Sequence, residues 1–300
     1  MLRHVLGISW VAALGACHAS TPAVPRAGEQ LQVRRPGDAV EFAIIGDFGS
    51  AGPAEADVAA LVHRWTPEFI VTTGDNNYVH GAASTIDENI GQYYHDFISP
   101  YVGEFGAGAA DNRFFPALGN HDWRATDLAP HTDYFALPGN ERYYTISWGP
   151  VDVFVVDSDP HEPDGIDADS AQARWLEQTM KAADGPWKLV LMHHPPYSSG
   201  DHGSSPALRW PYAQWGATAV IAGHDHHYER IEQDGILYFV NGLGGNPERY
   251  AVKTPVEGSA VRYNADHGAM RVYADTQGIR FEFVNRSGEI VDSVTRKPAG

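Results

Sequence analysis

Five short apolar runs, each followed by a cluster of polar side chains, limit what this chain can fold into more than any other feature. The clusters are Asp47-Phe48-Gly49, Gly74 to Tyr78, Gly119 to Asp122, Val190 to His193, and Gly223 to His226. A short apolar run bounded by turn residues is typical of a buried strand. Ligands bind beyond the carboxyl ends of strands in open α/β sheets, so the five clusters are predicted to meet in one crevice.

The segments around these clusters predict alternating strands and helices. Residues 41–47 and 68–75 have the pattern of buried strands, and residues 54–65 between them have that of an amphipathic helix. This order is typical of a parallel strand-helix-strand unit, so the fold class is expected to be α/β. The other expected elements are strands at 113–120, 151–159, 188–194 and 217–226, a helix at 170–183, and two hairpins, 228–233 with 236–242 and 271–277 with 279–285.

The first 38 residues are predicted to lie outside the catalytic fold. Residues 1–16 combine a basic residue with an apolar stretch too short to span a bilayer, which is typical of a signal peptide. They end in a sequence similar to a bacterial lipobox, directly before the only cysteine, Cys17, so we expect lipid on Cys17. An ordinary secretory peptide is the alternative. Residues 17–38 are expected to be a flexible tether, and residues 39–300 one catalytic domain.

The acidic balance of the chain bears on its partners and its location. With 21 Lys and Arg against 38 Asp and Glu, the formal charge is −17, which argues against a nucleic-acid binder. Such a protein can act on phosphate only if positive charge is supplied locally, and bound metal ions can supply it. We expect an exported monomer in the bacterial cell envelope, lipid-anchored on the periplasmic or the cell-surface side.

The order of the five clusters resembles the calcineurin-like metallophosphoesterase superfamily. Most of its members begin with Asp-x-His, in which the His is a metal ligand, but this chain has Gly49 at that place. Tyr78 stands three residues after Asp75, and Gly-Asp-x-x-Tyr combined with Asp-x-Gly resembles the purple acid phosphatases, the small tartrate-resistant type above all. A phenolate is a hard anionic donor that favours ferric iron. The resemblance covers residues 41 to 246.

The resemblance implies a four-layer α-β-β-α sandwich of two mixed sheets flanked by helices. It also implies a dinuclear centre of Fe(III) with a divalent metal, which can be iron, zinc or manganese. By this match the ferric ligands are Asp47, Tyr78 and His226; the divalent ligands are Asn120, His193 and His224; and Asp75 bridges both.

The implied activity is acid phosphatase-type hydrolysis of small phosphate monoesters. A metal-bound hydroxide would attack phosphate in line, and because metals lower the pKa of water, an acidic optimum is expected. His121 is expected to protonate the leaving group, with His202 as the second candidate and Asp201 holding His202 charged. His194 and His227 lie beside motif histidines and are assigned supporting roles, because alternate residues of a strand face opposite sides.

Two other functions stay open from the sequence. A phosphodiesterase or nucleotide hydrolase of the same superfamily would use the same metals with a different rim, and residues 197–205 and 241–249 are expected to form that rim. A non-catalytic lipoprotein that retains phosphate or metal is the third possibility, against which the intact His121 argues.

Overall fold

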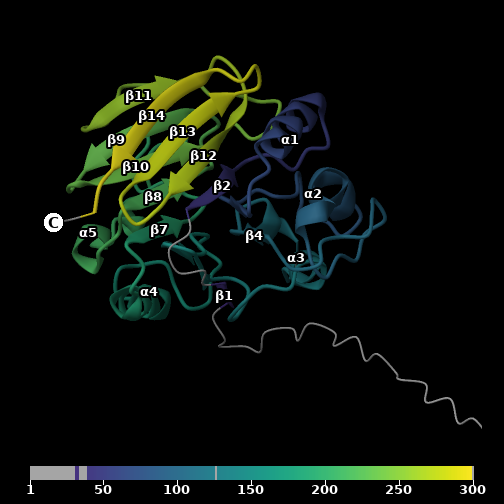
Figure 1. The fold of residues 1–300 in the computed structure, drawn as a ribbon, viewed down its shortest axis with the longest axis horizontal. Helices are drawn as coiled ribbons and strands as arrows, with labels where there is room; N and C mark the ends of the chain where they lie inside the picture. Colours follow the sequence, from purple (N-terminus) through teal and green to yellow (C-terminus); the bar gives the residue numbers. More distant parts are fainter. Residues whose placement is uncertain (1–30, 34–38, 126, 299–300) are drawn as a thin grey trace, which may run out of the picture.

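The computed structural model describes residues 31–33, 39–125 and 127–298, arranged in two mixed sheets with helices on their outer sides (Figure 1). The expected signal peptide, Cys17 and most of the expected tether lie outside the described residues. Within the described part of the chain, no helix is long and apolar enough to cross a membrane.

The first sheet has eight strands in the order β1, β5, β6, β7, β8, β10, β9, β11. A parallel centre consists of β6, β7, β8 and β10, and antiparallel pairs extend it on both sides. The bounds are β1 (Leu31–Val33), β5 (Tyr144–Trp148), β6 (Val151–Val155), β7 (Trp187–Leu191), β8 (Ala219–Ala222), β9 (Tyr228–Gln233), β10 (Ile236–Asn241) and β11 (Ser259–Tyr263).

The second sheet has six strands in the order β14, β13, β12, β2, β3, β4. Its strands β2, β3 and β4 are parallel, and β12 joins them to an antiparallel half. The bounds are β2 (Val40–Ile45), β3 (Ile70–Thr72), β4 (Phe114–Pro116), β12 (Gly268–Ala274), β13 (Ile279–Asn285) and β14 (Ile290–Arg296).

Alternating side chains along the strands build two apolar cores. On β7, Leu189 and Leu191 belong to the large core between the sheets, whereas Val190 belongs to a smaller core with Leu176 and Met180 of α4. The period of two along a strand therefore produces the layers. The helices are α1 (Pro53–Trp65), α2 (Gln92–Tyr94), α3 (Ala129–Tyr134), α4 (Ala171–Ala182) and α5 (Tyr212–Trp215).

The structure confirms the α/β class, the two mixed sheets with flanking helices, and the strand-helix-strand unit of β2, α1 and β3. It also contains a strand that the sequence did not predict. Leu31–Val33, expected to be part of the tether, pairs in parallel with β5 as β1. The reason is that β6 pairs with only one edge of β5. The backbone groups along the other edge of β5 are therefore available to pair with a further strand.

Candidate metal centre

The five polar clusters meet beyond the carboxyl ends of β2, β3, β4, β7 and β8, where the parallel strands of both sheets end. The structure brings all seven expected ligands into one network of contacts there. Asp47, Asp75 and His193 are buried, and one ligand atom from each lies within 4.8 Å of the others. The convergence follows from short turns after buried strands, which leave their polar side chains little freedom.

Asp47, Tyr78 and His226 form one side of this network. The Tyr78 hydroxyl lies 3.4 Å from Oδ1 of Asp47 and 3.2 Å from Nε2 of His226. That same Nε2 lies 3.4 Å from Oδ1 of Asp47. Three donor atoms from three separate loops thus face one another, as expected from the sequence for a shared cation.

Asn120, His193 and His224 form the other side. Nε2 of His193 lies 3.0 Å from Oδ1 of Asn120 and 3.2 Å from Nδ1 of His224. Oδ1 of Asp75 lies 3.4 Å from the same Nε2. Asp75 therefore stands between the two groups of three, which is the place required of a bridging carboxylate.

The inward-facing nitrogen atoms of two histidines carry lone pairs. Nδ1 of His193 lies 2.8 Å from the carbonyl oxygen of Thr73, and Nδ1 of His226 lies 2.9 Å from that of Glu248. A carbonyl can only accept, so the proton of each neutral ring is on Nδ1 and Nε2 is bare. Two bare nitrogens, with carboxylate and amide oxygens beside them, form a donor set that metal ions can fill.

The electrostatics of the network lead to the same conclusion. Burial, followed by the neighbouring Asp47 and Asp122, raises the pKa of Asp75. Burial, followed by the carboxylates of Asp75 and Asp47, also raises the pKa of Tyr78. A phenolate in this place therefore requires positive charge nearby, which would reverse the shift. The chemistry of the donor set fits two metal ions.

Position 49 cannot hold a side chain in this fold. A Cβ atom on Gly49 would lie 1.8 Å from the carbonyl oxygen of Asn76, which is far inside contact distance. The two loops are also joined by a hydrogen bond from the Tyr78 amide to the Gly49 carbonyl, 2.7 Å long. The loop that carries Tyr78 thus occupies the space that a histidine at position 49 would need.

Asp122 holds the loops of Asp75 and Asn120 together, a role that the sequence analysis did not assign. Its buried carboxylate accepts hydrogen bonds from the backbone amides of Asn76 and Gly119 and from the Asn76 side chain, at 2.9 to 3.3 Å. The only signal in the sequence was its place directly after His121. The pairing with Asn76 depends on loops 46 residues apart and could not be read from the sequence.

His121 lies against the network but outside it. Its backbone amide donates to Oδ1 of Asp75 at 2.9 Å, and its Nε2 is 3.9 Å from Oδ2 of that residue. Nδ1 lies 2.8 Å from the Val79 carbonyl, to which Arg124 also donates at 3.1 Å. Burial, helped by the charge of Arg124, lowers the pKa of His121 to about 4. Nη1 of Arg124 lies 3.0 Å from the same Nδ1, and the ring is neutral above that pH, with Nε2 turned toward Asp75.

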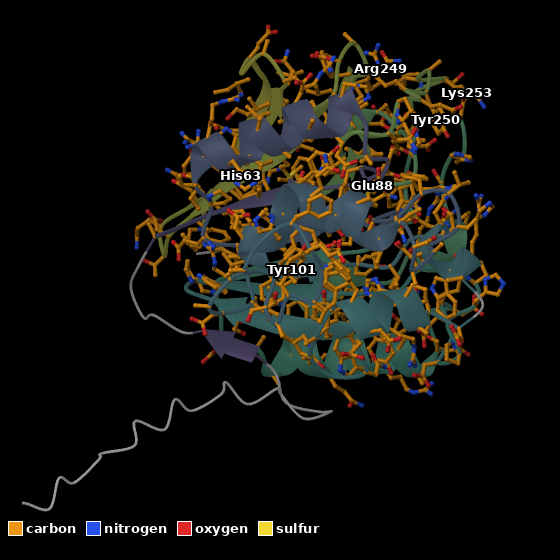
Figure 2. All side chains as sticks on the ribbon, turned by 90° about the vertical axis from the view of Figure 1, so that its right-hand side faces the viewer. His63, Glu88, Tyr101, Arg249, Tyr250 and Lys253 are labelled. Atoms are coloured by element: carbon orange, nitrogen blue, oxygen red, sulfur yellow. The ribbon has the colours of Figure 1, made fainter. Side chains whose placement is uncertain are left out.

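His202 is held near the network by ring contacts. Its exposed imidazole stacks on His224, with centroids 4.2 Å apart, and meets the edge of Tyr250 at 5.2 Å. Tyr250 in turn stacks flat on His226 at 4.3 Å. The four rings form a continuous row that joins both sides of the network. Arg249, Tyr250 and Lys253 lie on one side of the molecule (Figure 2).

The expectation for Asp201 needs correction. Its carboxylate pairs with Lys253, 3.1 Å away, and no ion pair with His202 is present among the described residues. The loop is fixed instead by Asp225, whose buried carboxylate accepts from the amides of His202 and Gly203 at 2.8 and 3.2 Å. Asp201 and His202 are neighbours on an exposed turn, and there the cation of Lys253 reaches the carboxylate.

The two additional histidines differ in their surroundings. Nε2 of His227 lies 3.2 Å from Oε2 of Glu229, away from the expected ligands, in keeping with a supporting role. His194 is nearer to the expected ligands. One of its ring nitrogens and one from each of His193 and His224 all lie within 4.8 Å of one another. Nδ1 of His194 is also 3.0 Å from the Ser158 hydroxyl, so its supporting role stays a prediction.

The comparisons with known proteins agree with this geometry. Residues 40–228, more than half of the chain, match the family described as Calcineurin-like phosphoesterase. Purple acid phosphatase 17 of Arabidopsis thaliana is 26% identical over 285 residues, covering 84% of this chain and 80% of that protein. Tartrate-resistant acid phosphatase type 5 of Homo sapiens is 24% identical over 244 residues, covering 69% and 73%.

Two solved structures share the fold. Purple acid phosphatase PPD1 from yellow lupin superposes with a TM-score of 0.71 at 18% identity, over 92% of this chain. The chain spans 55% of that longer protein. GAP50, described as the anchor in the inner membrane complex of Plasmodium, superposes with a TM-score of 0.66 at 18% identity, covering 87% of this chain and 90% of that one.

Proposed function

This chain belongs to the calcineurin-like phosphoesterases and is a metal-dependent phosphatase, and we propose that it hydrolyses small phosphate monoesters at a centre of Fe(III) and a divalent metal. The observation that carries the proposal is the contact of Tyr78 with Asp47 and His226, opposite a position 49 that has no room for a side chain. A phenolate in place of an imidazole favours ferric iron.

The residues of this chain have separate tasks in the proposed reaction. Asp47, Tyr78 and His226 would hold iron, Asn120, His193 and His224 would hold the divalent ion, and Asp75 would bridge them. When bound, the two ions supply positive charge for the phosphate and acidity to water. The formal charge of −17 makes this local positive charge the main attraction for a phosphate dianion.

His121 is proposed to deliver the proton to the leaving alcohol. Its Nδ1 is occupied by contacts with the Val79 carbonyl and with Arg124, so Nε2 is the ring nitrogen left to exchange a proton with the substrate. A bound phosphate dianion beside the ring raises its pKa from about 4, because an opposite charge stabilises the imidazolium. His202, on the far side of His224, is proposed to contact the phosphate and orient it.

GAP50 is a useful contrast, because a protein described as an anchor shares this fold. The fold alone therefore does not support catalysis, and the proposal depends on the side chains at the strand ends.

A substrate screen tests the proposal. Purified protein should turn over alkyl and aryl phosphate monoesters, with an acidic optimum, faster than diesters and nucleoside triphosphates. Preference for a diester or a nucleotide would point to another activity of the same superfamily, and retention of phosphate without turnover would point to a binding protein. We further propose that the protein is exported and anchored by lipid at Cys17, on the sequence similarity alone.

A further inference from the structure

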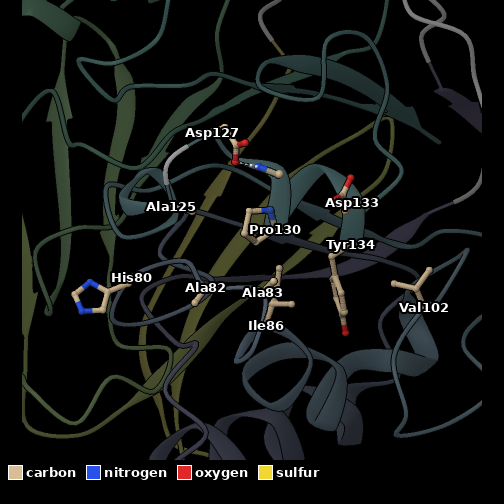
Figure 3. Close-up of a pocket in the computed structure, with 11 residues that line it drawn as sticks. His80, Ala82, Ala83, Ile86, Val102, Ala125, Asp127, Pro130, Asp133 and Tyr134 are labelled. Atoms are coloured by element: carbon tan, nitrogen blue, oxygen red, sulfur yellow. Dashed lines mark hydrogen bonds between the residues drawn. The ribbon is translucent and has the colours of Figure 1, made fainter.

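A groove of about 590 Å³ lies in the surface formed by residues 80–86, 125 and 127–134, and no expected ligand lines it. Figure 3 shows the groove between His80 at one end and Val102 at the other. Most of the side chains between these ends are small or apolar, namely Ala82, Ala83, Ile86, Ala129 and Pro130.

The groove begins next to the residue proposed to protonate the leaving group. Nδ1 of His121 lies 2.8 Å from the carbonyl oxygen of Val79, the residue before His80. Arg124, which precedes the groove residue Ala125, donates to the same carbonyl at 3.1 Å. The peptide group between Val79 and His80 therefore separates Nδ1 of His121 from the groove, whereas Nε2 of the same ring faces Asp75.

Exposed apolar side chains lie at both ends of the groove. Four large apolar side chains are exposed in the described part of the chain, and two of them adjoin the groove: Val79 at 55% and Val102 at 63%. Val79 precedes the groove at the His121 end, and Val102 lines the opposite end. Exposed apolar side chains gathered beside a cavity mark a binding site for an apolar group.

The charges in the groove disfavour an anionic occupant. Asp127 and Asp133 line it, and no Lys or Arg does. One oxygen of Asp127 accepts from the Ala129 amide at 3.1 Å, as the dashed line in Figure 3 marks, and Asp133 is exposed. A leaving group that carries further phosphates, such as a nucleoside diphosphate, would meet two carboxylates and no Lys or Arg among the lining residues.

We propose that this groove binds the leaving alcohol of the substrate, and that the preferred substrates are phosphate monoesters of apolar alcohols rather than nucleotides. The proposal rests on the proposed function. Water gives its oxygen to phosphorus while the bond from phosphorus to the alcohol oxygen breaks, and His121 supplies the proton that this oxygen takes up. The attacking water releases a proton in the same reaction, which replaces the proton that His121 gives to the alcohol oxygen. The alcohol oxygen leaves beside Nε2 of His121, and the body of the alcohol extends past the Val79–His80 peptide into the groove.

The test compares kcat/KM for n-alkyl phosphates from ethyl to octyl, below their micellar concentrations. In the parent protein kcat/KM should rise with each methylene, at most about fourfold per step, the value for full burial of a methylene. Ala83→Trp fills the groove from an exposed position, and it should flatten this rise, so that kcat/KM for octyl phosphate falls relative to that for ethyl phosphate. The matched control is Ser84→Trp, because Ser84 is also exposed but does not line the groove.

A second variant keeps the test informative if Ala83→Trp fails to fold. Val102 lies at the end of the groove far from His80, so Val102→Asp should lower kcat/KM only for the longest chains. A parent with no dependence on chain length, an equal effect of Ala83→Trp and Ser84→Trp, or a preference for nucleoside triphosphates over octyl phosphate would each overturn the proposal.

A binding measurement separates this proposal from the proposed function. With 1-hexanol, the product alcohol alone, amide NMR shifts should change at Ala82, Ala83 and Val102 and stay constant in Ala83→Trp. If the protein hydrolyses no ester but these shifts change, the groove binds apolar alcohols and the proposed function is wrong. If it hydrolyses esters and the shifts do not change, the groove proposal is wrong.

Discussion

The lack of a side chain at Gly49 determines which loop supplies the ligand on that side of the centre, namely the loop of Tyr78. The backbone of Asn76 fills the space beside Gly49, so a ligand to the same side of the centre has to come from the loop of Tyr78. The sequence alone indicated the exchange, because Asp-x-Gly and Gly-Asp-x-x-Tyr occur together. The steric reason became visible only with both loops in place.

Gly49→Ala should therefore destabilise the protein. Its Cβ would lie 1.8 Å from the Asn76 carbonyl oxygen, and a shift of backbone is expected to cost about 1–3 kcal/mol of the free energy of unfolding. Urea denaturation measures the loss. Gly52→Ala, in the same loop with nothing within 4 Å of its Cβ, is the control. Equal stability of the two variants would contradict the steric account.

His121→Ala should keep both metals and lower turnover by about two to four orders of magnitude, the range for a lost general acid. The loss should be smaller for p-nitrophenyl phosphate, whose leaving group needs no proton, than for an alkyl phosphate. His161→Ala is the control, because that exposed ring contacts Asp159 and Trp123 instead of the centre. Equal losses on both esters would show that His121 is not the proton donor.

Tyr250 is expected to act by holding His202. The His202 ring has no hydrogen bond among the described contacts and is fixed by His224 and Tyr250. At unchanged metal content, Tyr250→Ala should lower kcat/KM, and it should add nothing to His202→Ala in the double variant. Tyr250→Phe should retain most of the activity, and Tyr273→Ala, a half-buried ring elsewhere, is the control. Additive losses would mean that Tyr250 acts independently.

At the scale of elements, the sequence predicted all five strands that end in site residues. It also predicted β6 and the hairpin strands β9, β10, β12 and β13, but not β1, β5, β11 and β14. The expected strands at 41–47, 68–75, 113–120, 188–194 and 217–226 correspond to β2, β3, β4, β7 and β8. Their apolar runs are continuous because both faces are buried, and that pattern is legible without a partner. The observed strands are shorter, since the polar clusters belong to the loops.

The unpredicted elements depend on partners far along the chain. β11 exposes alternate residues and exists through pairing with β9, and β14 pairs with β13. β5 is fully buried, but a polar and aromatic segment precedes it, so the sequence pattern does not indicate where the strand begins. The same holds in the site: the seven expected ligands could be read from motifs, whereas the contacts of Asp122, Asp225 and Tyr250 connect separate loops and could not.

At the scale of the whole molecule, the proposed lipid anchor at Cys17 would hold the enzyme at a membrane. We expect mass spectrometry of the native protein to find cleavage before Cys17 and lipid on its sulfur, because the preceding residues resemble a lipobox. Replacement of Cys17 by Ser should release the protein from membranes without changing turnover in vitro. An unmodified Cys17, or cleavage elsewhere, would remove the anchor from the account.

The central claim is that one compact fold joins five loops into a two-metal centre with tyrosinate on iron. Metal analysis and the visible spectrum of Tyr78→Phe beside the parent test it most directly. The parent should contain two metal ions per chain, one of them iron, and show a violet or pink charge-transfer band, which Tyr78→Phe should lose together with tight iron binding. An active, colourless parent with zinc or manganese in both sites, unaffected by Tyr78→Phe, would contradict it.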